Sequence, residues 1–251
     1  SVPSASITES HLADKLLAFR QQQDGFLVPS FNPISGSGPN GAIVHYRAIA
    51  GADRELASDD LLLLDSGGHY RDGTTDITRT IAIGTPPNGA VAAYSHVLQS
   101  HIHLAMAKFP TGTNGKQLDA IARAPLWAAG LDFAHGTGHG VGHVLSVHEG
   151  PASISKRGDV ALEAGMVLSN EPGYYQTGDW GIRIENLIVV TPAKQTGFLE
   201  FETITLCPLD RRLIDKTLLD AGEIGWIDHY HRAVYEQLHP HLSPMAKSWL
   251  E

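Results

Sequence analysis

The stretch LLLLDSGGHYRDGTTDITRTIAIG, residues 61–84, decides the fold. Its first five residues are an apolar run that ends in Asp65, as in a buried strand. Turn-forming residues follow and predict a loop over 66–74. Residues 76–84, which open with Asp76, alternate between apolar and polar side chains and predict a second strand. We therefore expect an antiparallel hairpin that carries an aspartate on each strand.

A second pair of predicted strands carries two glutamates. AGMVLSNEPG (164–173) and GIRIENLIVV (181–190) read as strands joined by YYQTGDW, with Glu171 at the end of the first and Glu185 inside the second. Strand interiors rarely hold acidic residues, and a buried carboxylate without a cation is costly. Any one of the four carboxylates could end a strand or pair with Arg79 or Arg183. Together they indicate that cations bind here.

An imidazole could complete this set of ligands. HGTGHGVGHVLSVHEGP, residues 135–151, contains four histidines and one glutamate. Four carboxylates overmatch the charge of one divalent ion and suit two, and mostly oxygen ligands with one nitrogen favour Mn²⁺, Co²⁺ or Zn²⁺. Paired divalent ions are typical of two-metal hydrolases. The residues alone leave open which histidine is the ligand.

The rest of the chain predicts one mixed α/β domain over residues 1–251. Ser6 and Glu9 have capping-box spacing ahead of a predicted helix over 8–23. Four of the histidines are expected to be solvated or at the edge of the core: His69, His96, His101 and His103. The other predicted elements are a short strand over 42–46 that bears His45, helices over 88–108, 115–129 and 221–238, and a strand over 201–209.

Composition excludes several classes of protein. The net charge of −9, without a basic block, argues against a nucleic-acid partner. No apolar run is long enough to span a membrane. The single cysteine, Cys207, fits a reducing compartment, so a cytoplasmic location is expected. The first residues have no signal-peptide pattern and no initiator Met, so we expect a fragment or a processed chain.

Six motifs in this order resemble one enzyme family. The chain is similar to the catalytic domain of the aminopeptidase P (Xaa-Pro aminopeptidase) family of M24 metallopeptidases. The resemblance implies an α+β pita-bread fold, in which a curved antiparallel sheet with two pseudo-symmetric halves is flanked by helices. The motifs are GAIVHY (41–46), LLLLDSGGHYRDGTTDITRTIAIGTP (61–86), HGTGHGVGHVLSVHEGP (135–151), LEAGMVLSNEPGYY (162–175), GIRIENL (181–187) and FETITL (201–206).

The resemblance also implies roles for individual residues. Two divalent ions, most often Mn²⁺ in this family, would be held by Asp65, Asp76, His139, Glu171 and Glu185. Asp76 and Glu185 would bridge the ions, and Glu171 would also accept the proton of the attacking water. His45, His135 and His148 match histidines that bind substrate and stabilise the transition state. Arg183 matches an orienting arginine, while Tyr174 and Trp180 are candidate substrate contacts, Trp180 being as well explained by packing.

The activity implied is hydrolysis of the bond between an N-terminal residue and a following proline, by a hydroxide held between the metals. Its partners would be peptides with proline in the second position, and the family often forms homodimers. Family members carry N-terminal domains and an opening helix that we expect to be absent here, so an inactive fragment of the parent enzyme stays an alternative. Prolidase or another M24 hydrolase is a further alternative. His143 is expected to be structural.

Overall fold

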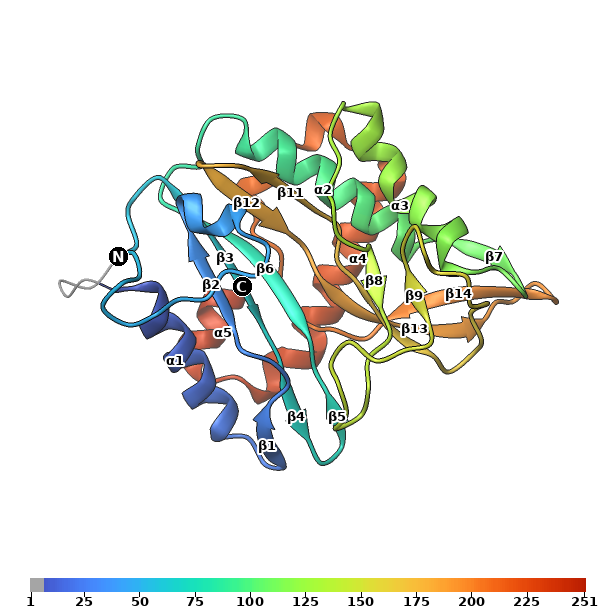
Figure 1. Cartoon of the computed structure of the whole chain (residues 1–251), viewed down its shortest axis with the longest axis horizontal. Coiled ribbons are helices and arrows are strands. Elements are labelled where there is room, and N and C mark those ends of the chain that lie inside the picture. Colours follow the sequence, from blue (N-terminus) through green and yellow to red (C-terminus); the bar gives the residue numbers. More distant parts are fainter. Residues whose placement is uncertain (1–6) are drawn as a thin grey trace.

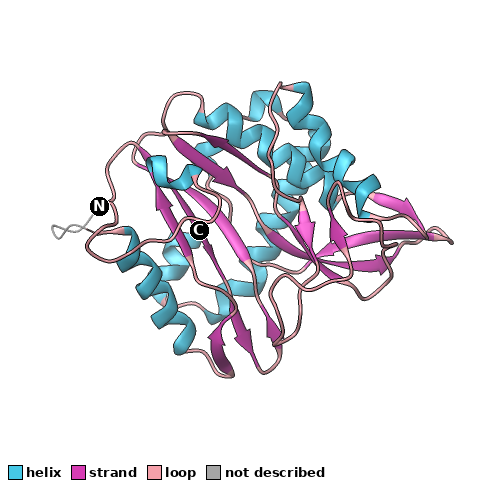
Figure 2. Ribbon diagram, viewed as in Figure 1, coloured by secondary structure: helices cyan, strands magenta, loops and turns pink. Residues whose placement is uncertain are grey.

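The strands of the protein form two antiparallel groups that meet in the middle of the molecule (Figure 1). The computed structural model describes residues 7–251. The first group is built from the N-terminal third of the chain and the second mostly from residues beyond 137. Helices lie around the outside of the strands (Figure 2). This is the mixed, curved antiparallel architecture expected from the sequence.

The predicted hairpin forms the centre of the first group. Strand β3 (Asp60–Ser66) pairs with β6 (Ile77–Ile83), and β2 (Ile34–Ser37) pairs with the other edge of β3. The expected loop between them is partly wrong, because β4 (Gly68–Tyr70) and β5 (Gly73–Thr74) continue the hairpin. Strand β1 (Phe26–Pro29) pairs with β4.

The second group contains a four-stranded sheet and a separate hairpin. The sheet is ordered β10 (Val167–Asn170), β13 (Asn186–Pro192), β14 (Phe198–Thr203) and β7 (Lys108–Pro110). The expected single strand over 181–190 is wrong: it is divided into β12 (Trp180–Arg183), which pairs with β11 (Gly173–Gln176), and β13. Glu185 lies at the break, where its N–H donates to Thr78 O at 3.1 Å and joins the two groups.

Four of the helices were predicted close to their observed bounds. They are α1 (Glu9–Gln21), α2 (Ala90–Ala105), α3 (Gly115–Ala128) and α4 (Ala221–Leu238); a fifth, α5 (Pro244–Leu250), follows. The capping box of α1 is formed by Thr8 and His11. Ser6 lies outside the described residues. None of the described helices is long and apolar enough to cross a membrane.

The predicted strand over 42–46 is wrong. A 3-10 helix, η1 (Gly38–Ala42), ends where that strand was expected to begin, and Tyr46 N donates to Ile43 O in a turn. The carboxylate of Glu9, fully buried, accepts hydrogen bonds from the Tyr46 hydroxyl at 2.8 Å and from Arg54 N at 3.1 Å. The turn that carries His45 is therefore held by a distant helix.

Two apolar clusters hold the helices against the strands. One joins α2 and α4 to β12 through side chains such as Tyr94, Ile182 and Val234. The other joins α3 to β10 and β13 through Leu118, Leu168 and Ile188. Burying these side chains removes apolar surface from water and fixes the strand ends at which the candidate site lies.

Candidate metal centre and active site

The structure brings the four carboxylates and one imidazole of the predicted set together. Asp65 lies near the end of β3, Asp76 directly before β6, Glu171 directly after β10 and Glu185 between β12 and β13. The imidazole comes from His139, on the short strand β8 (Gly138–His139). Their ligand atoms fall within 4.8 Å of one another in overlapping groups: Asp65, Asp76 and Glu185; His139, Glu171 and Glu185; Asp76, His139 and His148.

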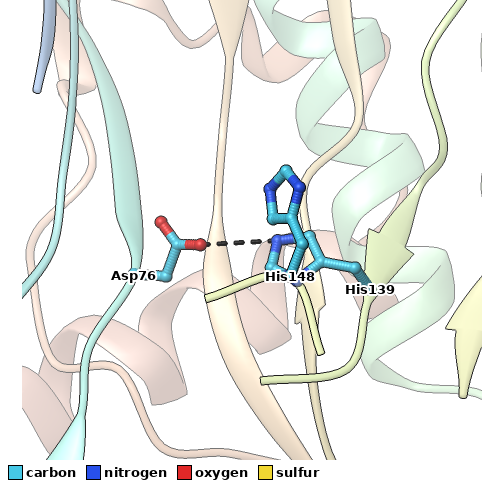
Figure 3. Close-up of side chains that lie close together, drawn as sticks. All are labelled: Asp76, His139 and His148. Atoms are coloured by element: carbon cyan, nitrogen blue, oxygen red, sulfur yellow. Dashed lines mark ion pairs between the residues drawn. The ribbon is translucent and has the colours of Figure 1, made fainter. Parts of the chain in front are cut away.

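His139 presents one ring nitrogen to the carboxylates. Its Nε2 lies 3.4 Å from Asp76 Oδ2 and 3.3 Å from Glu171 Oε1. Its Nδ1 lies 2.9 Å from Gly140 O, so Nδ1 carries the hydrogen in the tautomer that donates to this carbonyl. Nε2, which faces Asp76 beside His148 (Figure 3), is then the nitrogen that bonds the carboxylates when protonated and offers its electron pair to a metal when neutral. This is how histidine ligands of metals are oriented in proteins.

The carboxylates are buried close together, so burial and their mutual repulsion both raise their pKa values. Burial raises the pKa of Asp65 to about 6 and that of Glu171 to about 7, and raises that of Glu185 well above its usual range. Burial opposes the charge of His139, but its hydrogen bond with Asp76 and the charge of Glu171 outweigh burial and raise its pKa. All four shifts show a site that is short of positive charge.

One buried oxygen points to the same conclusion. Among the described residues, Asp65 Oδ1 has no hydrogen-bond partner, although it is fully shielded from solvent. A buried acceptor without a partner is costly. The donor set of carboxylate oxygens and one imidazole nitrogen therefore fits a pair of divalent cations, which would satisfy both the unpaired oxygen and the excess negative charge.

A chain of hydrogen bonds runs from Asp65 to His135. Arg183 Nη2 donates to Asp65 Oδ2 and its Nη1 donates to the Tyr175 hydroxyl, both at 2.7 Å. Burial raises the pKa of Tyr175 to about 12, so the hydroxyl keeps its proton. That proton is free to be donated to His135 Nε2 at 2.8 Å, and His135 Nδ1 then donates to Gly136 O at 2.7 Å. Both ring nitrogens of His135 are thus bonded within the protein.

A cavity of about 680 Å³ opens over the carboxylates. The predicted histidines His45, His135 and His148 line it, together with Arg183. Apolar side chains line it as well: Phe31, Pro33, Ile34, Val44 and Val147. Serine hydroxyls come from Ser153 and Ser155. Such a mixture of an apolar wall with a few polar groups is typical of sites that bind small organic molecules or peptides.

The three cavity histidines differ in surroundings. Burial lowers the pKa of His135 to about 4, so its ring is neutral near pH 7. Burial and then the neighbouring His139 lower the pKa of His148, whose ring centroid lies 4.0 Å from that of His139. No side-chain hydrogen bond joins the rings of His45 or His148 to another residue within 7–251, so both are available to a ligand.

Tyr174 and Trp180 lie away from the cavity lining. The Tyr174 hydroxyl donates to Gln176 Oε1 at 3.0 Å, and Trp180 is buried in the cluster that joins α2 and α4 to the strands. The packing explanation of Trp180 is the one its position favours. Tyr175, next to Tyr174 in the sequence, contacts Arg183 and His135 instead. Sequence reasoning missed it, because the two tyrosines differ only in which face of β11 they occupy.

Comparisons with known proteins agree with this geometry. Residues 3–192 match the model of metallopeptidase family M24, and residues 197–251 match the C-terminal region of peptidase M24. The chain is 47% identical to "Probable Xaa-Pro aminopeptidase P" of Laccaria bicolor over 97% of its length, and 48% identical to "Aminopeptidase P2" of Arabidopsis thaliana over 98%. It spans only 40% and 36% of these two relatives.

Solved structures of M24 enzymes are also similar to this chain. The X-prolyl aminopeptidase of Caenorhabditis elegans, described as a cytosolic enzyme with a di-nuclear active site, superposes with a TM-score of 0.93 at 43% identity, covering 98% of this chain and 42% of that one. The prolidase of Pyrococcus furiosus has a TM-score of 0.70 at 32% identity, covering 79% of this chain and 55% of that one. The chain belongs to metallopeptidase family M24 and has its pita-bread fold.

Proposed function

We propose that the protein is a dinuclear metallo-aminopeptidase that hydrolyses the bond between an N-terminal residue and a following proline. The observation that carries the proposal is the convergence of four buried carboxylates and His139 at the floor of the cavity. The relatives that match nearly the whole chain at 43–48% identity support X–Pro peptides as the substrate class.

Five side chains would hold two divalent ions, for which we propose Mn²⁺, with Co²⁺ or Zn²⁺ as alternatives. Asp65, Asp76 and Glu185 would contribute ligands from the first group of strands and its junction with the second, and His139 with Glu171 from the second group. When bound, such ions polarise a peptide carbonyl and make a coordinated water nucleophilic at neutral pH. Arg183 would hold Asp65 in its coordinating orientation through the bond to Oδ2.

Glu171 would take the proton of the attacking water. In the metal-free protein burial raises the pKa of Glu171 to about 7, and bound cations would lower it again and leave the carboxylate ionised to accept a proton. The Ser169 hydroxyl donates to Glu171 Oε1 at 3.0 Å and so orients the carboxylate. Burial thus raises the proton affinity of this carboxylate, and Ser169 sets its direction.

The cavity histidines would bind the peptide on either side of the scissile bond. His45 and His148 have ring nitrogens free to contact the substrate and the developing oxyanion. His135, held by Tyr175, would contact substrate only by exchanging that bond, so its main contribution would be a neutral ring of fixed tautomer. Proline has no N–H to satisfy, and the apolar wall of the cavity suits its ring.

A prolidase that cleaves X–Pro dipeptides is the second candidate. The prolidase structures cover 79–85% of the chain with TM-scores of 0.70–0.73, below the values for the C. elegans aminopeptidase. The higher TM-score, identity and coverage of the C. elegans aminopeptidase therefore favour the aminopeptidase. By analogy with the C. elegans enzyme we propose a cytosolic location for the whole protein. The homodimer that the family resemblance implies is proposed as well.

Cleavage of matched peptides tests the proposal. The Mn²⁺-loaded protein, with its metal content measured, is incubated with Arg-Pro-Pro and with the dipeptide Arg-Pro. Release of arginine from the tripeptide supports an aminopeptidase, and release from the dipeptide alone supports a prolidase. A protein that holds two ions per chain and cleaves neither peptide contradicts both.

A further inference from the structure

A strap of irregular backbone, residues 133–137, carries His135 into the cavity. It connects α3 to β8 without belonging to either, and no strand pairs with it. Irregular backbone that positions a functional side chain needs other partners for its carbonyls. In this strap the carbonyls of Phe133 and His135 are bonded by Arg123 of α3, whose guanidinium also pairs with Asp119 and Asp132.

Arg123 forms hydrogen bonds with the first part of the strap. Its guanidinium is 1% exposed and lies over the Phe133 ring, 3.9 Å from the centroid. Nη1 donates to Phe133 O and Nη2 donates to His135 O, both at 2.7 Å. The ring of Phe133 in turn lies 4.8 Å from that of His135. A planar guanidinium that bonds two carbonyls in fixed directions sets the path of the backbone between them.

Asp119 holds the other end of the strap. It lies one helical turn before Arg123, is 3% exposed, and accepts from Arg123 Nε at 2.8 Å. Its second oxygen accepts from the Thr137 hydroxyl at 2.6 Å. The Thr137 carbonyl then accepts from the N–H of Glu171 at 2.8 Å. One ion pair therefore reaches His135 on one side and the proposed general base on the other.

We propose that Asp119 and Arg123 are positioning residues, which act as a clamp that fixes His135 and the backbone of Glu171 relative to each other. Neither Asp119 nor Arg123 lines the cavity or belongs to the groups of ligand atoms. The effect of the clamp on the rate of hydrolysis rests on the proposed function. Its effect on the position of His135 is independent of that function. Small displacements of groups that act in the transition state lower kcat more than they weaken binding.

Three variants and one control test the clamp. Arg123→Lys keeps the charge and loses the planar fork, and Thr137→Val removes only the hydroxyl bonded to Asp119, which Thr137→Ser restores. We expect Arg123→Lys and Thr137→Val to lower kcat about 10- to 100-fold with KM changed less than about threefold. Thr137→Ser is expected to keep near wild-type kcat. Leu118→Ala, on the same helix but in the cluster around β10, is the control for lost stability alone.

A second measurement needs no activity. The imidazole ¹⁵N resonances of His135 in the metal-free protein report its tautomer and its bond to Tyr175, and Arg123→Lys and Thr137→Val are expected to shift them while Leu118→Ala is not. The clamp is overturned if the His135 resonances are unchanged in folded Arg123→Lys. If that variant does not fold, unchanged resonances in Thr137→Val overturn it. Wild-type protein that cleaves no X–Pro peptide refutes the proposed function, and the resonances still decide on the clamp.

Discussion

Arg183 and Asp65 form a buried ion pair between β12 and β3, with 2.7 Å between Nη2 and Oδ2. The pair leaves Asp65 Oδ1 buried and without a partner among the described residues. The arginine thus holds the carboxylate through Oδ2 and leaves Oδ1 as the oxygen without a partner. Because Tyr175 occupies Nη1, the guanidinium cannot rotate without breaking a second bond.

Replacing Arg183 by lysine is expected to weaken metal binding about 10- to 100-fold, because a lysine ammonium cannot bond Asp65 and Tyr175 in fixed directions together. Titration of the metal-free protein with Mn²⁺ measures the change. Arg212→Lys is the matched control, since Arg212 pairs with Asp210 at the surface. Equal affinities of Arg183→Lys and wild type would falsify the orienting role.

Metal removal is expected to cost more stability at neutral than at acidic pH. In the metal-free protein the raised pKa values of Glu171, about 7, and Asp65, about 6, mean that the folded state binds more protons than the unfolded state above about pH 4. The free energy of unfolding therefore falls as pH rises through this window. Bound metal displaces these protons and opposes the loss.

Thermal unfolding with Mn²⁺ and with a chelator checks this sign. The gain in Tm from metal should increase steadily from about pH 5 to about pH 7.5. A gain that is the same at both ends, or larger in acid, means that the carboxylates do not hold the ions.

His101 is expected to make the protein sensitive to acid. Burial lowers its pKa to about 3, so it stays neutral in the folded protein while the unfolded chain binds a proton below about pH 6.5. Its contribution to stability is present above that pH and is lost as pH falls, by up to about 1.4 kcal/mol per unit. Urea unfolding of the metal-free protein at several pH values should show a shallower acid slope for His101→Gln than for wild type. Parallel slopes contradict the assignment.

Tyr46→Phe is expected to loosen the turn that carries His45. The variant loses the hydrogen bond to the buried Glu9 carboxylate and should unfold about 1 kcal/mol more easily. KM for an X–Pro tripeptide should rise, because His45 lines the cavity. Tyr235→Phe, on the exposed side of α4, is the control for removing a tyrosine hydroxyl. Identical unfolding of both variants means that the Glu9 bond does not hold this turn.

Local patterns predicted the parts of the fold that local interactions determine. Helix α4 was expected over its observed residues because its apolar positions recur with helical spacing, and Asp220 with Glu223 caps its start. The hairpin of β3 and β6 was equally clear. The strand expected over 42–46 failed because the turn there depends on Glu9, far away in sequence. His101 was expected near solvent, yet it is fully buried against Asn186 and Trp226.

The residues of the candidate site were likewise predicted only where a local sequence pattern marks them. Four carboxylates stood out because acidic residues are rare in apolar strands, and the structure brings them together with His139. Tyr174 was chosen and Tyr175 was missed because the choice depends on the register of β11 and β12, in which Tyr175 lies opposite Gly181. A slip of one residue exchanges the faces of a strand. Arg123 and Asp119 were missed because their partners lie on irregular backbone.

The most direct test of the central claim is an anomalous-scattering map of crystals of the Mn²⁺-loaded protein. Two peaks about 3.5–4 Å apart, bounded by Asp65, Asp76, His139, Glu171 and Glu185, are the predicted result. One peak or none at these side chains, with full metal loading elsewhere, would contradict the account.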